Sequence, residues 1–346
     1  MSEATYLVSR TDAIGDVVLT LPVCGMLKRL FPGCRVVLIG RRYTAAVAAA
    51  CPWVDDFLSL DELAALPPEA QVAQLRSYKA AAILHVFPNK QLARLARQAG
   101  IPVRIGTRNR LFHWLTCNRL VALSRRHSPL HEAQLNLQLL APLGYSATPS
   151  LPEVAALVRL APTVPLHQQY QALLATRQAG QLNVLLHPRS RGSAREWGLG
   201  HFGELARLLH AMGHRVFVSG TAAEGAELAD WLRENAAYIT ADLTGKFELP
   251  EFLALLAAAD GIVAGSTGPL HLAAALGRHA LGLYPPIQPM HPGRWGPLGR
   301  HAEYLVFDRP GCEDCRAAPA ACTCIKAIAA GMVAAQVSAW LPPSET

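Results

Sequence analysis

Asp16 lies in a stretch whose residue types suit acid–base chemistry. The stretch 10–17 reads Arg-Thr-Asp-Ala-Ile-Gly-Asp-Val and follows an apolar run at Tyr6–Val8 that is typical of a buried strand. Gly15 permits a tight turn, and a helix that follows it would present free N–H groups. Asp16 is then either an N-cap that stabilises this helix or a general base that takes a proton from a hydroxyl. The spacing alone favours the cap. The pattern G-x-G-x-x-G is absent after this strand, which argues against an NAD-linked enzyme.

Basic and hydroxyl side chains gather in a second stretch, His187–Trp197. Three arginines, two serines and a glycine follow the apolar run Val184–Leu186. Arginine pairs phosphate through two hydrogen bonds and carries a permanent charge. Ligands of doubly wound folds bind at the carboxyl ends of strands. We therefore predict an anion site here, rather than a solvated basic loop with Trp197 packed in the core.

A third stretch, Val263–Ala275, has the pattern of a phosphate-binding turn. Ser266 or Thr267 can cap a helix that has Pro269 in its first turn and continues through alanines. Free N–H groups and the helix dipole then form a seat for phosphate. His271 falls in the same turn, where it either contacts the ligand or packs as an ordinary core histidine. No Asp-x-Asp pair follows a matching strand, so we expect a site without metal or cofactor.

Parallel sheets must position these stretches. Short apolar runs alternate with helical stretches before and after a proline-rich junction near 149–165, and this alternation implies parallel sheets covered on both faces. We predict an α/β chain with two doubly wound units and a cleft between them. The expected strands are Tyr6–Val8, Val36–Ile39, Ala81–Leu84, Val103–Ile105, Val184–Leu186, Val216–Val218, Tyr238–Thr240, Gly261–Val263 and Leu281–Leu283. The expected helices include Val17–Leu30, Tyr43–Ala50, Gln91–Gln98, Phe202–His210 and Leu249–Ala259.

Composition supports this organisation. A length of 346 residues is enough for two domains. An apolar fraction of 51% is too high for a disordered chain. No run of about 18 uncharged apolar residues could cross a bilayer. The first residues carry an acid where a signal peptide would be basic, so we expect a cytoplasmic protein.

The net charge of +7 belongs to one segment. Between Ala70 and His131 there is no Asp or Glu, while 11 residues are Lys or Arg; the rest of the chain has 21 basic and 25 acidic residues. This acid-free window should face something negative.

In this order, the three stretches resemble glycosyltransferase family 9, the lipopolysaccharide heptosyltransferases and their relatives. The match spans most of the chain. Its markers are Ile14-Gly15-Asp16 with Leu19-Thr20-Leu21-Pro22, and the run 266–275, Ser-Thr-Gly-Pro-Leu-His-Leu-Ala-Ala-Ala. The resemblance implies a GT-B fold, in which two Rossmann-like domains face a central cleft. The implied domains are 1–165 for the acceptor and 175–325 for the nucleotide sugar, with a last helix within 326–346 crossing back to the first domain.

The resemblance also implies an activity, the inverting and metal-independent transfer of a sugar, typically heptose from ADP-heptose, to the inner core of lipopolysaccharide. Asp16 matches the residue that deprotonates the acceptor hydroxyl, and Arg195 takes the place of a lysine that contacts the donor phosphates. Glu224 resembles a carboxylate that binds the ribose, and Phe247 an apolar neighbour of the adenine. The implied donor site comprises Ser190, Arg195, Glu224, Phe247, Ser266, Thr267, Gly268, Pro269, Leu270 and His271.

Ser266 departs from the family pattern, because well-known heptosyltransferases have an acidic residue there that contacts the donor sugar. The donor sugar and its base therefore stay open. So do two rival functions, a sugar-nucleotide epimerase on the same fold and a non-enzymatic protein that binds nucleotides or nucleic acid.

The acid-free window falls in the half that the resemblance assigns to the acceptor. We expect Arg104, Arg108 and Arg110 to face an anionic glycolipid, with peripheral contact at the cytoplasmic face of the inner membrane. We expect no nucleic acid partner, since the window has few aromatic side chains on which bases could stack.

Eight cysteines in so long a chain do not make a disulfide scaffold, and Cys24, Cys34, Cys51 and Cys117 should be reduced thiols in the core. Four others, Cys312, Cys315, Cys322 and Cys324, lie within 13 residues. The last pair is closer than structural zinc sites favour, so either metal or packed thiols remain possible interpretations.

Overall fold

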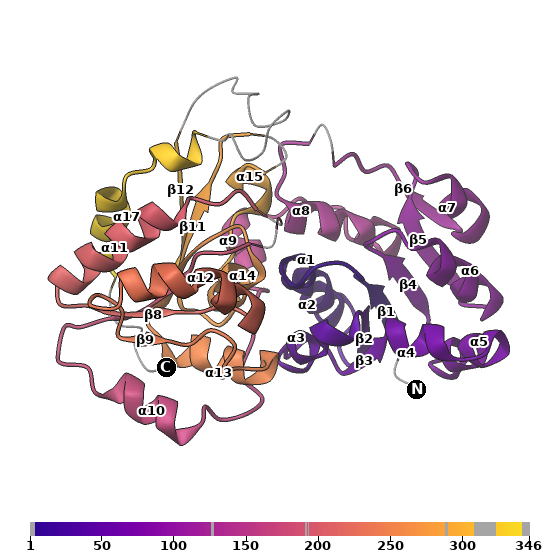
Figure 1. Ribbon diagram of the computed structural model, residues 1–346. Coiled ribbons are helices and arrows are strands. Elements are labelled where there is room, and N and C mark those ends of the chain that lie inside the picture. Colours follow the sequence, from indigo (N-terminus) through magenta and orange to yellow (C-terminus); the bar gives the residue numbers. More distant parts are fainter. Residues whose placement is uncertain are drawn as a thin grey trace. The chain divides into compact units, whose positions relative to one another are not determined.

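The chain divides into two compact units, Met1–Ala161 and Pro162–Thr346 (Figure 1). The computed structural model describes residues 4–125, 128–190, 192, 194–287, 290–307 and 323–340. Each unit contains a six-stranded sheet in which every described strand pair is parallel. The predicted α/β class with two doubly wound units is confirmed.

The first unit has the strand order β3-β2-β1-β4-β5-β6. Its strands are β1 (Thr5–Ser9), β2 (Arg35–Gly40), β3 (Asp56–Ser59), β4 (Ala82–His85), β5 (Val103–Thr107) and β6 (Arg119–Val121). Its α-helices are α1 (Ile14–Val18), α2 (Leu21–Leu30), α3 (Ala45–Ala49), α4 (Leu60–Ala65), α5 (Pro68–Ser77), α6 (Lys90–Gln98), α7 (Leu111–Thr116), α8 (Glu132–Leu137) and α9 (Leu151–Ala155), with 3-10 turns η1 (Arg42–Thr44) and η2 (Gln138–Leu143).

The second unit has the order β12-β11-β10-β7-β8-β9. Its strands are β7 (Asn183–His187), β8 (Arg215–Val218), β9 (Ala241–Asp242), β10 (Gly261–Gly265), β11 (His279–Tyr284) and β12 (Ala302–Val306). Its helices are α10 (Gln168–Ala175), α11 (Leu199–Ala211), α12 (Ala222–Glu234), α13 (Leu249–Ala258), α14 (Gly268–Ala275), α15 (Pro292–Trp295), η4 (Ile325–Ala327) and α17 (Ala330–Ser338).

In both sheets the strand order reverses in the middle, and this reversal of order favours a ligand site at that point. In the first unit the order changes between β1 and β4, and in the second unit between β7 and β10. At such a point the loops after neighbouring strands run to opposite faces of the sheet and leave a crevice at the carboxyl edge. The central strands are apolar because both of their faces are covered, and Val36, Val37, Leu38 and Ile39 are all fully buried.

The C-terminal helix α17 packs against α11 in the second unit. Val333, Val337 and Trp340 belong to the same hydrophobic core as Phe202 of α11. The indole of Trp197 donates a hydrogen bond to the carbonyl of Ile328, 2.8 Å away, which ties the chain before α17 to this core. That this helix also returns to the first domain stays a prediction, as do the domain limits expected from the sequence.

The strand predicted at Tyr238–Thr240 is wrong. Tyr238 lies in a turn closed by its backbone N–H to Asn235, and strand pairing begins only at Ala241, opposite Phe217. The helical stretch predicted at 17–30 is divided into α1 and α2 around Leu19 and Thr20.

Candidate functional site

Asp16 is the third residue of α1, inside its first turn. Ala13 occupies the N-cap position with extended backbone (φ −81°, ψ 161°) and makes no side-chain capping bond. The interpretation of Asp16 as an N-cap is therefore wrong. Its carboxylate instead forms an ion pair with the guanidinium of Arg10, at the end of β1.

Arg10 is the centre of a charge cluster at the reversal of the first sheet. Its side chain is only 4% exposed and binds three carboxylates: Asp12 at 2.7 Å, Glu132 at 3.1 Å, and Asp16. Glu132, at the start of α8, is 1% exposed and also accepts a bond from Nε of Arg125 at 2.9 Å. Among the described residues, these three carboxylates share the guanidinium groups of Arg10 and Arg125.

Burial and the neighbouring charges affect proton binding by Asp16. Burial raises the pKa of Asp16 to about 6, and the nearby Asp12 and Glu132 carboxylates add to this, while the Arg10 guanidinium acts in the opposite direction. Arg10 stays charged: burial lowers its pKa, but the three carboxylates outweigh burial and hold the pKa above its ordinary value. The Asp16 side chain remains 20% exposed. A reachable carboxylate with a pKa near neutrality suits a general base.

The backbone around Asp16 is held from several sides. Thr20 donates its hydroxyl to the Asp16 carbonyl at 2.9 Å, and Asn136 of α8 donates to the Leu19 carbonyl at 3.1 Å. The exposed Tyr43 donates its hydroxyl to the Asp12 carbonyl at 2.6 Å. Tyr43, Glu132 and Arg125 are not among the site residues that the sequence predicts. The only signal was that Glu132 is the first acid after the acid-free window.

In the second unit, the predicted anion-binding loop contains a carboxylate of its own. Glu196 accepts hydrogen bonds from the Ser190 backbone N–H at 3.0 Å and hydroxyl at 3.2 Å, and its other oxygen pairs with Arg189 at 3.1 Å. Arg189 also contacts Glu227 at 3.5 Å. Ser190 and Arg189 therefore hold the loop in shape. Contact of Ser190 and Arg195 with the donor stays a prediction.

The third stretch forms the expected strand–turn–helix. Thr267 is the N-cap of α14 (φ −123°, ψ 164°), and Pro269 is in its first turn. The Thr267 side chain makes no capping bond, and its buried hydroxyl has no partner among the described residues. Leu270 is fully buried and His271 is 3% exposed, so both side chains pack inside the unit. A buried hydroxyl beside the N-terminal N–H groups of an eight-residue helix can bind an anion.

The second and third stretches meet at the reversal between β7 and β10. His187 at the end of β7 is opposite Ala264 of β10. A Cβ atom on Gly265 would lie 3.4 Å from the carbonyl oxygen of Arg195, so the loop passes directly beside the turn before α14. The two stretches that the sequence suggested for a diphosphate are therefore neighbours in the fold.

Ser266, where the family pattern has an acid, lies close to the buried hydroxyl of Tyr284. The Tyr284 hydroxyl donates to the Trp295 carbonyl at 2.7 Å. Burial raises the pKa of Tyr284, so this phenol stays protonated. The turn thus carries hydroxyl groups where the pattern has a carboxylate.

Glu224 and Phe247 have structural contacts as well as their implied roles. Glu224 is 5% exposed, and its carboxylate accepts bonds from the Thr221 N–H at 2.7 Å and hydroxyl at 2.9 Å, as the capping box of α12. Phe247 is half-buried and packs on Tyr170, with ring centroids 4.6 Å apart. The ribose and adenine roles stay predictions.

The three arginines of the predicted acceptor face differ. Arg104 donates from Nε to the Thr116 carbonyl at 2.8 Å and also binds the Ile101 carbonyl, so it ties the end of α7 to the turn before β5. Arg108 and Arg110 are exposed. Their contact with an acceptor stays a prediction.

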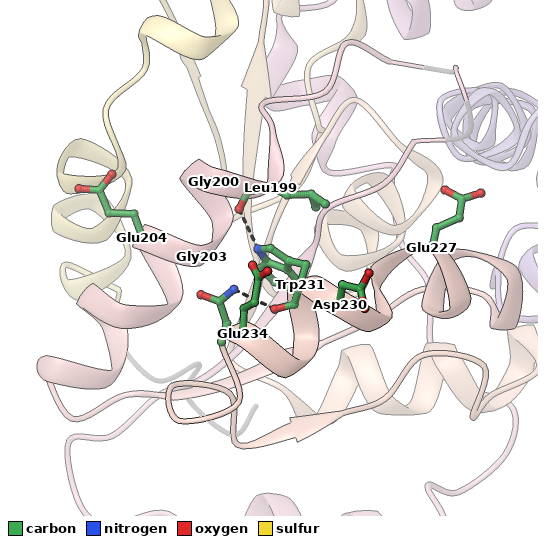
Figure 2. A pocket seen from close by; sticks show the side chains of 9 residues that line it. Leu199, Gly200, Gly203, Glu204, Glu227, Asp230, Trp231 and Glu234 are labelled. Atoms are coloured by element: carbon green, nitrogen blue, oxygen red, sulfur yellow. Dashed lines mark hydrogen bonds between the residues drawn. The ribbon is translucent and has the colours of Figure 1, made fainter.

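A cavity of about 540 Å³ lies between α11 and α12, where Trp231 donates to the Leu199 carbonyl at 2.8 Å; Figure 2 shows the residues that line it. Its lining includes four carboxylates, Glu204, Glu227, Asp230 and Glu234. These negative charges would repel a nucleoside diphosphate, so the cavity does not suit the donor.

Cys24, Cys34, Cys51 and Cys117 are buried, as predicted. Burial raises the pKa of Cys51 and Cys117 to about 11, which keeps both thiols protonated. Cys324 is buried too, but Cys312, Cys315 and Cys322 lie outside the described residues, so the metal question there is untested. Within the described ranges, no group of three or more His, Cys, Asp and Glu side chains could hold a metal ion. In the same ranges, no helix has the length and apolar character to cross a membrane.

The chain is similar to known glycosyltransferases. Residues 72–325 match the model of glycosyltransferase family 9 (heptosyltransferase). Lipopolysaccharide heptosyltransferase 1 of Escherichia coli O18:K1:H7 is 26% identical over 326 residues, 89% of this chain and 92% of that protein.

Solved structures give the same result for the fold. E. coli ADP-heptose lipopolysaccharide heptosyltransferase II has a TM-score of 0.75 at 20% identity, covering 97% of this chain and 98% of that one. E. coli heptosyltransferase WaaC, solved with ADP and with ADP-2-deoxy-2-fluoro heptose, has TM-scores of 0.67 and 0.64 at 20% identity, covering 96% of this chain and 98% of that one. The protein thus has the GT-B fold and is a glycosyltransferase that belongs to family 9, the lipopolysaccharide heptosyltransferase-like family.

Proposed function

We propose that this chain transfers heptose from ADP-heptose to the inner core of lipopolysaccharide or a related glycolipid, with inversion at the anomeric carbon and without a metal ion, at the cytoplasmic face of the inner membrane. The observation that carries this proposal is Asp16, a partly exposed carboxylate whose pKa is raised to about 6 at the carboxyl edge of the first sheet. Family membership and the relatives solved with ADP and a fluorinated ADP-heptose support the donor.

The proposed reaction is a single displacement. The acceptor oxygen attacks the anomeric carbon of the donor while Asp16 takes the hydroxyl proton, and the bond from that carbon to the diphosphate oxygen breaks. The electron pair leaves with ADP. The N-terminal N–H groups of α14, the Thr267 hydroxyl and the Arg195 guanidinium would stabilise its charge. Asp16 then returns the proton to solvent.

The variant Asp16→Asn tests this role, because it keeps the size of the side chain and removes the base. We expect kcat to fall about 100-fold or more, while ADP affinity measured by calorimetry stays within error. Glu62→Gln, an exposed carboxylate of the same unit, is the control. Unchanged turnover by Asp16→Asn would contradict the base assignment.

Two further measurements test the reaction class and the donor. We expect ADP release only when acceptor is present, because the acceptor is the nucleophile; release without acceptor favours an epimerase or hydrolase. We expect ADP but not UDP to raise the melting temperature, since a ligand that binds only the folded state stabilises it. Full activity in the presence of a chelator would support metal-independent transfer, and loss of activity would contradict it.

A further inference from the structure

Helix α7 presents apolar side chains to solvent. Leu111, Trp114 and Leu115 are 88%, 59% and 73% exposed. Their spacing of i, i+3 and i+4 places them on one face of the helix. The opposite face holds the buried His113 and Thr116, so the orientation of α7 is set by packing.

This exposed face is held firmly. The Trp114 indole donates to the Arg108 carbonyl at 2.9 Å, which fixes the ring against the preceding loop. Arg97 of α6 donates to the Leu115 carbonyl at 2.7 Å, and the two helices pack side by side (Figure 1). His113 accepts a bond from the Thr107 N–H at 3.0 Å and anchors the inner face. The apolar side chains therefore stay exposed without disordering the helix.

Exposed basic side chains lie on the elements next to α7 in the chain or packed against it. The exposed basic residues of α6, of the loop before α7 and of β6 are Lys90, Arg94, Arg97, Arg108, Arg110 and Arg119. They all come from the acid-free window between Ala70 and His131. We call Leu111, Trp114 and Leu115 together with Arg108 and Arg110 the α7 surface.

We propose that the α7 surface docks the enzyme on an anionic phospholipid bilayer, with the two leucines and the tryptophan inserted at the interface. Tryptophan suits this depth because its ring is apolar and its N–H is polar, and basic side chains beside apolar ones pair with lipid phosphates. A second copy of this chain fits poorly, since it would bring like charges together.

The docking site is also well placed for an acceptor carried by a membrane. Helix α7 follows the carboxyl end of β5, and Asp16 follows the carboxyl end of β1, at the same edge of one parallel sheet. Only β4 separates these strands, so their ends are about 10 Å apart at a strand spacing of roughly 4.8 Å. Docking through α7 would hold the Asp16 edge close to the lipid surface.

Flotation with vesicles tests the proposal on the full chain. The vesicles contain phosphatidylcholine with or without about a third of phosphatidylglycerol, and neither donor nor acceptor is present, so the result is independent of the proposed transfer. We expect binding to the anionic vesicles that weakens in high salt.

Two pairs of variants separate the apolar and ionic contributions. Leu111→Ser/Leu115→Ser should weaken binding at least tenfold, and Arg108→Gln/Arg110→Gln should weaken it by about fivefold per arginine. The matched controls are Met212→Ser/Met332→Ser, which changes exposed apolar residues of the second unit, and Arg159→Gln/Arg207→Gln, which changes exposed basic residues. Quenching of tryptophan fluorescence by brominated lipid should occur in the wild type and decrease in Trp114→Phe.

Three results would overturn the proposal: no binding to anionic vesicles, equal loss in the control variants, or unchanged binding of Leu111→Ser/Leu115→Ser. If light scattering instead showed that this double variant converts a dimer to a monomer, the α7 surface would be a protein interface.

Discussion

Replacing Asp12 with asparagine should shift the acidic limb of the pH–rate profile to lower pH. In the wild type we expect this limb near pH 6, where Asp16 loses its proton and becomes able to act as a base. Asp12 raises the pKa of Asp16 in two ways: its negative charge disfavours a second one nearby, and its 2.7 Å ion pair occupies Arg10. The Asp12→Asn substitution would remove both effects, which act in the same direction, so the sign of the change is well defined.

The size of the change follows from the geometry. Asp12 and Asp16 bind different nitrogens of one guanidinium, so their charges lie within the roughly 4–6 Å over which a neighbouring charge shifts a pKa, and the upper value gives the smaller effect. At an effective dielectric constant of 20 to 40, removing one charge at about 6 Å changes the free energy of ionisation by about 1.4 to 2.8 kcal/mol, which lowers the pKa by about 1 to 2. The acidic limb should therefore move to between about pH 4 and pH 5.

The measurement is kcat/KM against pH for the wild type, Asp12→Asn and Glu62→Gln. Glu62→Gln removes the same charge from an exposed position, so it reports any general effect of net charge. The Tyr43 bond to residue 12 uses the backbone carbonyl and survives in Asp12→Asn. A limb that stays at its place or moves to higher pH would refute the idea that Asp16 controls it.

Two other changes test the second unit. Thr267→Ala should weaken ADP binding, measured by calorimetry, about tenfold. Its melting temperature should change little, because the Thr267 hydroxyl makes no capping bond to α14. A loss of about 1 kcal/mol in stability on thermal unfolding would mean that the hydroxyl caps the helix. Gly225→Ala should lower the free energy of unfolding by about 1 to 3 kcal/mol, since its Cβ would lie 2.8 Å from Cβ of Thr244. The control is Gly331→Ala, because a Cβ atom there would meet nothing within 4 Å. In chemical denaturation this variant should be neutral or slightly stabilising. An equal loss of unfolding free energy in the two variants would rule out the clash as the cause.

The position of a strand within its sheet decided whether the sequence could predict it. The eight inner strands, β1, β2, β4, β5, β7, β8, β10 and β11, were all predicted from apolar runs. The four edge strands were missed or misplaced: β3, β6 and β12 were not predicted, and β9 was predicted at Tyr238–Thr240 instead of Ala241–Asp242. An edge strand is partly exposed, so its sequence is more polar and lacks the continuous apolar run of a strand that is covered on both faces.

The short helix α7 was not predicted from the sequence, for a related reason. Six residues with three apolar side chains on the solvent side do not show the pattern of a helix that buries its apolar face. The basic window did indicate this part of the chain, but only the structure separates Arg104, which binds the carbonyl at the end of α7, from the exposed Arg108 and Arg110.

The sequence by itself determined the α/β class, the two units and the stretches that follow β1, β7 and β10. A local pattern is enough for these features. A buried strand must be apolar, and the glycine, hydroxyl and basic residues of the loop after it follow directly in the chain. Only the tertiary structure decided the surroundings of Asp16. Its partner Arg10 is bound to Glu132, 122 residues further along the chain, and burial of this cluster raises the pKa of Asp16. No local pattern encodes such a pairing, because folding alone brings the charges together and removes water from around them.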